Sequence, residues 1–136
     1  MADDKRKETL REFLHLFFRG ELPESLALLH DDVRFRIPGR APLSGEFHGR
    51  DEVSRHIVQY RGFANDTGDV LKWEDWLVGP GHVAAVATAH MQHPGSLMTT
   101  RLVFIAAFSG DGRIKDFEVF FSDPRELERF AAGWGA

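Results

Sequence analysis

IPGRAPLSGEFHGRDEV, residues 37–53, is the stretch of sequence that decides the fold. It joins a short strand-like run to an amphipathic helix, and it contains five turn-forming residues: Pro38, Gly39, Pro42, Gly45 and Gly49. Glycine adopts backbone conformations that are closed to other residues, and proline fixes its own φ angle. The stretch therefore predicts a turn-rich connection with a fixed path rather than a flexible linker.

The composition predicts a single globular domain with a large apolar interior. The chain has 136 residues, of which 43% are hydrophobic, with 12 Phe against one Tyr. The net charge of −4 and the lack of a basic patch lead us to expect no nucleic-acid partner. Cysteine is absent, which excludes disulfides, thiolate catalysis and cysteine-based metal sites. No signal peptide or membrane-spanning run is visible, so we expect a cytoplasmic protein with no membrane partner.

The periodicity of the apolar residues predicts helices first and strands afterwards. Helices are expected over 8–18, from residue 23 onward, over 51–60 and over 123–132. Strands are expected over 33–37, 70–78, 82–92, 97–109 and 113–121. Trp73 and Trp76 are three residues apart, so we expect them on opposite faces of their strand. Helices followed by a run of strands indicate an α+β fold.

Three motifs carry a family resemblance. They are the stretch 37–53, the sequence DGRI at 111–114 and the sequence FFSDP at 120–124. With the order of elements they resemble the SnoaL-like proteins, which belong with the ketosteroid isomerases in the nuclear transport factor two superfamily. Residues 1–136 then form a single SnoaL-like domain. The resemblance implies a cone-shaped, strongly curved, mostly antiparallel sheet wrapped around three N-terminal helices, with a short C-terminal helix.

The resemblance also implies a homodimer that pairs through the convex face of the sheet. On that face we expect Val103, Ile105 and Ala107, beside Arg101, to form an apolar patch. Such a patch is too large to remain in water.

The positions that carry catalysis in ketosteroid isomerase fall on apolar residues of this chain. By the resemblance, the oxyanion-hole tyrosine maps to Phe13, the base to Ile37 and the oxyanion-hole acid to Phe104. None of these side chains can donate a hydrogen bond or accept a proton, so the steroid isomerase mechanism is expected to be absent. An aspartate of the related epoxide hydrolases maps to Val119, and the neighbouring Glu118 is expected to face outward.

The concave face of the sheet is expected to bind a small apolar molecule. On this template the ligand-binding residues are Phe13, Phe17, Ile37, Met91, Leu102, Phe104, Phe117, Val119 and Phe121. Alanines at 85, 87 and 89 either leave room for the ligand or let a helix pack close to the sheet.

His56 and Tyr60 are the candidate catalytic residues. They are four residues apart on the 51–60 helix and share one of its faces. A neutral imidazole is a general base near neutral pH, and a tyrosine hydroxyl can donate to a developing oxyanion. The alternative is an ordinary helix histidine that is hydrogen-bonded at the edge of a cavity. No metal site and no cofactor are predicted.

Two functions follow from these features. The first is a cofactor-independent cyclase, isomerase or dehydratase that acts on a small apolar, polyketide-like metabolite. The alternative is a non-catalytic module for binding a small molecule or for dimerisation.

Overall fold

The computed structural model describes residues 4–18, 21–39, 44–59, 71–93 and 96–132. Within these residues the elements follow in the order α1 (Lys5–Phe18), α2 (Leu22–Leu26), β1 (Leu29–Ile37), β2 (Gly45–His48), α3 (Gly49–Gln59), β3 (Leu71–Val78), β4 (Val83–His93), β5 (Ser96–Phe108), β6 (Ile114–Phe121) and α4 (Pro124–Ala132). This order confirms the predicted α+β fold with N-terminal helices and a short C-terminal helix. No described helix is both long and apolar enough to cross a membrane.

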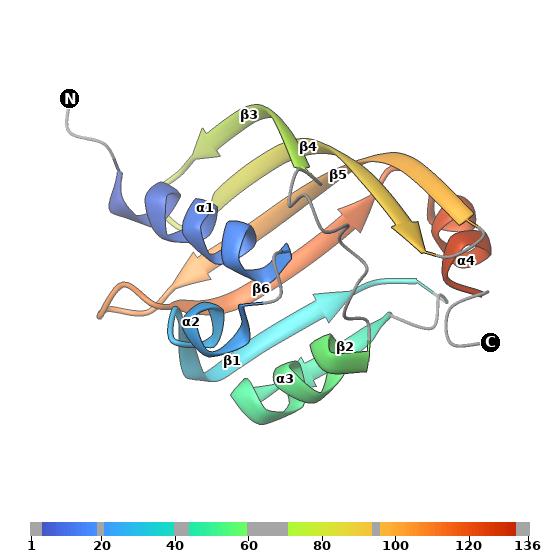
Figure 1. Ribbon diagram of the computed structural model, residues 1–136. Helices are drawn as coiled ribbons and strands as arrows, with labels where there is room; N and C mark the ends of the chain where they lie inside the picture. Colours follow the sequence, from blue (N-terminus) through green and yellow to red (C-terminus); the bar gives the residue numbers. More distant parts are fainter. Residues whose placement is uncertain (1–3, 19–20, 40–43, 60–70, 94–95, 133–136) are drawn as a thin grey trace.

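The six described strands form one sheet in the order β2-β1-β6-β5-β4-β3 (Figure 1). Strands β1 and β6 run parallel, and every other neighbouring pair is antiparallel. The parallel pair places Phe35 opposite Phe117, so residues from the two ends of the chain share one part of the core. The sheet is mixed and mostly antiparallel, as expected. Its cone shape and strong curvature remain predictions.

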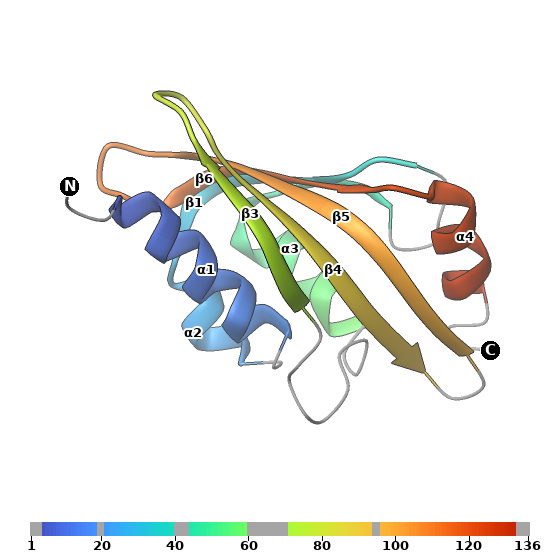
Figure 2. The ribbon, with the colours of Figure 1, turned by 90° about the horizontal axis from the view of Figure 1, so that it is seen from above.

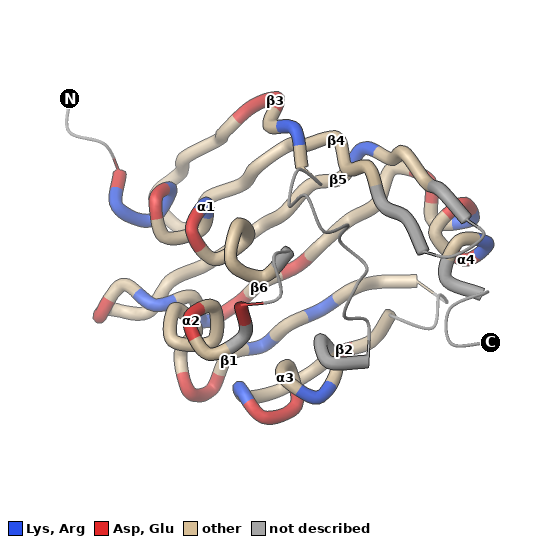
Figure 3. Tube along the Cα trace, in the orientation of Figure 1, with Lys and Arg blue, Asp and Glu red and all other residues tan. Residues whose placement is uncertain are grey.

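Helices cover only one side of the sheet. Figure 2 shows α1, α2 and α3 on the same side, which we call the inner face, and the opposite side is the outer face. Leu10, Phe13 and Leu14 of α1 are fully buried, as their helical spacing predicts. Figure 3 shows long stretches without charge along β4 and β5, the strands that lie beneath α1. The apolar stripe of α1 and the inner face together enclose the core.

Aspartates cap the first and last helices. Asp4 Oδ1 accepts a hydrogen bond of 2.9 Å from the Arg6 backbone N–H at the start of α1. Asp123 Oδ1 accepts bonds of 3.1 Å and 3.2 Å from the backbone N–H groups of Arg125 and Glu126 at the start of α4. These groups have no partner inside the helix, so the caps fix where each helix begins. The helix predicted to begin at the Asp123–Pro124 pair is confirmed.

The stretch 37–53 contains a strand that the sequence did not predict. Residues Gly45–His48 form β2, which pairs antiparallel with β1, so Phe47 lies opposite Phe35. The predicted turn chemistry is nevertheless present, because Gly49 has a φ of 82°, a conformation that favours glycine. β1 also begins at Leu29 rather than at residue 33. The four residues of β2 contain one large apolar side chain, Phe47, which is too few for an alternation with a period of two to be visible.

The two strand tryptophans lie on the same face, so the prediction of opposite faces was wrong. The β3–β4 register shifts between Trp73 and Asp75, which places Trp73 opposite Ala87 and Trp76 opposite Ala85. The bulge at Glu74 adds one residue and reverses the alternation beyond it. The two indole rings are 4.8 Å apart between centroids.

Two cations of α1 cover the second indole of this pair. Lys7 Nζ lies 5.6 Å from the centroid of the Trp76 ring, and Arg11 Cζ lies 5.1 Å from it. Both distances fall within the range of cation–π attraction. These contacts hold α1 against the edge strand β3.

Candidate ligand-binding site

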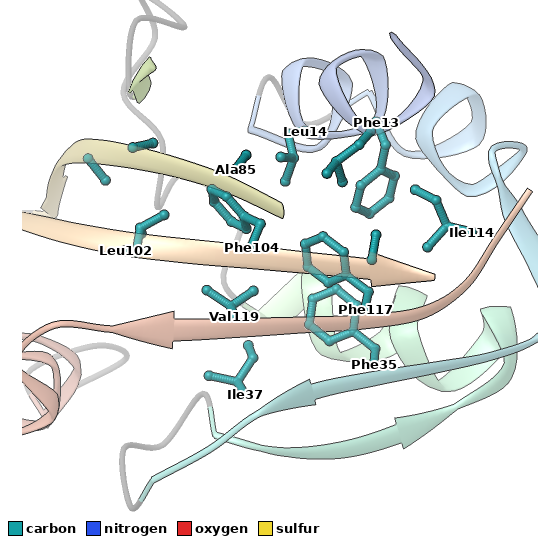
Figure 4. Close-up of a cluster of buried hydrophobic side chains, with 14 of the residues drawn as sticks. Phe13, Leu14, Phe35, Ile37, Ala85, Leu102, Phe104, Ile114, Phe117 and Val119 are labelled. Carbon is teal, nitrogen blue, oxygen red and sulfur yellow. The ribbon is translucent and has the colours of Figure 1, made fainter. Parts of the chain in front are cut away.

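A cluster of phenylalanine rings fills the centre of the inner face. The Phe117 ring lies 4.9 Å from Phe35, 5.3 Å from Phe13 and 5.8 Å from Phe104, measured between centroids. Figure 4 shows these rings converging from α1, β1, β5 and β6. Phe17 extends the cluster, because its ring is 5.6 Å from Phe13 and 6.2 Å from Phe35. Four of the nine lining positions named from the resemblance, Phe13, Phe17, Phe104 and Phe117, therefore meet in one place.

The other predicted lining residues on β1, β5 and β6 share this face. Leu102 pairs with Phe121, and Phe104 pairs with Val119. Ile37 at the end of β1 is 8% exposed, and Phe121 is half-buried. Their placement follows the predicted alternation, whereas their role in ligand binding stays a prediction.

Two of the predicted site residues cannot be placed. Tyr60 lies outside the described residues. Met91 pairs through its backbone with Met98 of β5, but its side chain also lies outside what the structure describes. The pairing of His56 with Tyr60 therefore remains a prediction from helical spacing.

His56 lies at the edge of the ring cluster, where α3 packs on β2. Its imidazole stacks on the Phe47 ring at 3.9 Å between centroids, with the two planes 23° apart. Phe47 in turn is 6.4 Å from Phe35. His56 is half-buried, so the candidate base contacts the apolar interior through one intervening ring.

The described interior holds almost no polar side chains. Ser25 of α2 and Thr100 of β5 are the only buried polar or charged residues in the described ranges. No Asp or Glu among those residues is buried, whereas Phe13, Ile37 and Phe104 all are. The described residues also contain no group of three or more His, Asp or Glu side chains placed to hold a metal ion. This interior is apolar, and its strand residues provide no carboxylate base.

The charged residues of the late strands form ion pairs with residues of β1 and β3 on the outer face. Glu118 forms an ion pair of 2.7 Å with Arg36 of β1. Arg101 Nε lies 3.1 Å from Glu74 Oε2, the same oxygen that accepts a bond of 3.0 Å from the Thr88 hydroxyl. Glu118 and Arg101 face outward, as predicted, and both have partners within the chain.

Sequence reasoning missed three aromatic residues of the inner face. Phe35 lies in the alternation of residues 33–37, so its inward position was visible in the sequence. Phe47 lies in a stretch that reads as turns, and Trp76 depends on the bulge at Glu74. No local pattern in the sequence indicates either of the last two.

One feature of acid–base chemistry lies far from this site, in the turn between β5 and β6. The Asp111 carboxylate accepts hydrogen bonds from the Ser109 hydroxyl and from the side chain and backbone N–H of Arg113. These bonds hold the pKa of Asp111 well below its ordinary value of 3.8. The arrangement stabilises the turn.

Comparison with known proteins supports the resemblance noted in the sequence. The family profile described as SnoaL-like domain matches residues 10–117. The uncharacterised protein Rv0034 of Mycobacterium tuberculosis is 29% identical over 132 residues, covering 97% of this chain and 100% of that protein.

Two solved structures illustrate the similarity of the fold. An NTF2-like protein of unknown function from Burkholderia pseudomallei superposes with a TM-score of 0.80 and 26% identity, covering 96% of this chain and 100% of that one. TerC, solved after co-crystallisation with polyporic acid, has a TM-score of 0.77 at 16% identity, covering 96% of this chain and 100% of that one. The profile match spans most of the chain. The chain belongs to the SnoaL-like domain family, with an NTF2-like fold.

Proposed function

We propose that this SnoaL-like domain binds a small, largely apolar molecule between α1, α3 and the inner face of the sheet. The observation that carries the proposal is the composition of that face. Its described residues are aromatic or aliphatic with a single buried hydroxyl, yet Phe17, Phe47, Trp73 and Phe121 remain only half-buried. Ligand pockets typically combine apolar walls with a few polar groups. The resemblance implies that the face closes into a cone around such a pocket.

We further propose that His56 transfers a proton on the bound molecule, as a cofactor-independent cyclase, isomerase or dehydratase would require. A neutral imidazole half-buried beside Phe47 can accept a proton from a carbon next to a carbonyl. The electrons of the broken C–H bond move onto the carbonyl oxygen, and the resulting enolate later takes a proton back. The Tyr60 hydroxyl would donate to that oxygen. The apolar wall would also restrict the conformations of a polyketide-like substrate.

Deuterium exchange into a simple ketone tests both parts of this proposal. The probe is 1-tetralone, a two-ring ketone with exchangeable hydrogens next to its carbonyl. Thermal unfolding with and without 1-tetralone measures binding, and mass spectrometry in D₂O measures deuterium uptake by the ketone. We expect a raised Tm and exchange faster than in buffer. His56→Ala should slow the enzymatic exchange by about 10²- to 10⁴-fold while binding persists.

His48→Ala is the matched control, because His48 lies on the outer face and pairs with Glu46 at 3.0 Å. It should leave the exchange rate unchanged. A rate that is equal in the wild type and in His56→Ala would remove His56 from the mechanism. A raised Tm without any exchange would instead support the second candidate function, a non-catalytic binding module. The apolar side chains of Phe13, Ile37 and Phe104 favour that alternative, because these buried positions provide no acid or base.

A homodimer through the outer face is proposed as the assembly state. No described helix covers this face, and Val103 and Ile105 at its centre are only half-buried, while Phe120 is 38% exposed. Ala107, expected in the same patch, is buried within one chain, with 8% of its surface exposed. Paired charges lie on either side of the apolar residues, with Arg36–Glu118 on one side and Arg101–Glu74 on the other. A second copy would cover the apolar residues that lie between these two ion pairs.

A further inference from the structure

Thr100 carries a hydroxyl on an inner face that is otherwise apolar in the described strands β4, β5 and β6. It lies on β5 between the buried residues Met98 and Leu102, and its cross-strand partner is Ala89 of β4. On the described inner faces of β4, β5 and β6, every other side chain is aliphatic, aromatic or a thioether. Thr100 is only 5% exposed. A buried hydroxyl on such a wall requires a hydrogen-bond partner, because burial removes it from water.

The described structure does not provide a good partner for that hydroxyl. Its only contact among the described residues is with the backbone carbonyl of the adjacent Arg101, at 3.4 Å. Hydrogen bonds between oxygens normally measure 2.5–3.0 Å, so this contact is weak. The same carbonyl already accepts a bond of 2.8 Å from the Ser122 N–H. Ser25, the other buried polar side chain of the described core, has a bonding partner.

Small and half-buried side chains surround Thr100 on the inner face. Ala89 opposite it has the smallest side chain compatible with the strand, and Leu71, which pairs with Ala89 from β3, is half-buried. On the other side, Leu102 pairs with the half-buried Phe121. An apolar molecule against these side chains would lie next to Thr100 in the sheet.

We propose that Thr100 is a specificity residue of the ligand site, and that its hydroxyl donates a hydrogen bond to a carbonyl oxygen of an otherwise apolar ligand. The inference rests on the proposed function, since it requires a ligand on the inner face. It goes further by naming the polar group that the ligand carries. Without ligand the hydroxyl is buried and poorly bonded, so it destabilises the empty protein. When a ketone is bound, the hydroxyl gains a closer partner than the described residues provide.

The proposal makes two linked predictions for Thr100→Val, which keeps the shape of the side chain and removes the hydroxyl. The ligand-free variant should be more stable than the wild type, with Tm raised by about 2–6 °C. At the same time it should bind a ketone about 5- to 10-fold more weakly. A residue with a purely structural hydrogen bond would show the opposite change in Tm. Thr100→Ser keeps the hydroxyl and should retain ketone binding.

The binding test compares 1-tetralone with tetralin, which differ only by the carbonyl group. Wild-type protein should prefer 1-tetralone, and Thr100→Val should lose that preference while it still binds tetralin. Thr99→Val is the matched control. Thr99 is the adjacent residue and lies exposed on the outer face, where its hydroxyl contacts His90 Nδ1 at 3.0 Å. It should leave the preference for the ketone unchanged.

The outcomes separate this inference from the proposed function. If wild-type protein binds neither compound, the apolar ligand site and the assignment of Thr100 both fail. If both compounds bind equally, or if Thr100→Val keeps the preference for the ketone, the site stands and the role of Thr100 is refuted. A fall in Tm for ligand-free Thr100→Val would also refute it, because the hydroxyl would then stabilise the fold itself.

Discussion

Removing the Phe117 ring should destabilise this protein more than removing any aromatic ring from its outer face. Phe117 is 1% exposed, and its ring has three aromatic neighbours within 5.8 Å: Phe13, Phe35 and Phe104. These neighbours come from α1, β1 and β5, so relaxation of one element cannot fill the space that Phe117→Ala leaves. Truncating a buried phenylalanine costs about 3–5 kcal/mol, and the loss of three aromatic contacts favours the upper end of that range.

The expected loss can be converted into a melting temperature. With an unfolding entropy of about 2.1 cal/mol/K per residue, a chain of 136 residues should lose roughly 10–17 °C in Tm for a loss of 3–5 kcal/mol. Phe120→Ala is the matched control, because Phe120 is three residues away on the same strand, faces outward and is 38% exposed. Its cost within one chain should be about 1 kcal/mol.

Urea unfolding followed by circular dichroism measures both variants. The protein should be kept at about 1 µM or less, so that association does not add to the measured stability. The reasoning fails if Phe117→Ala costs under about 2 kcal/mol, or if both variants lose the same amount. Either result would mean that the ring cluster is not the centre of the core.

Three further perturbations probe the outer face, a turn and the first helix. Ile105→Lys places an ammonium group opposite Glu118 within the sheet and should convert the proposed homodimer into a monomer in sedimentation velocity; a wild type that is itself monomeric would refute the dimer. The pKa of Asp111 is depressed in the folded state, so its contribution to stability is complete above pH 3.8 and is lost as the pH falls below that value. Asp111→Asn should therefore flatten this part of the acid unfolding curve. An unchanged curve would contradict the assignment. Arg11→Met should cost about 0.5–1 kcal/mol in urea unfolding by removing a cation from the Trp76 ring, and no change in either stability or tryptophan emission would exclude that contact as a stabilising one.

Local sequence patterns were sufficient for most of the elements. The apolar spacing of α1, the Asp123–Pro124 start of α4 and the alternation along β5 and β6 all depend on residues within a few positions of each other. The same alternation put Phe117 and Val119 on one face, and the resemblance placed them inward with Leu102 and Phe104. The apolar character of the interior was also visible, because it depends only on which residues occupy those positions.

The arrangement of the candidate site depended on contacts between distant residues. β2 exists because four residues pair with β1, and without it Phe47 would not reach His56. The single extra residue at Glu74 reverses the alternation of β3 and brings Trp73 and Trp76 together. Neither feature leaves a periodic signal in the sequence.

The sequence alone determined that this protein is an α+β domain with an aromatic, nearly carboxylate-free interior, because composition and periodicity are local properties. Only the tertiary structure decided which polar groups lie at that interior. Strand order, register and the bulge set whether a residue such as Thr100 or His56 meets water, a ring or an apolar wall. Strand order and register depend on the packing of segments far apart in the chain. A given register is stable only when it places the apolar side chains on the buried face of the sheet and the polar ones on the other.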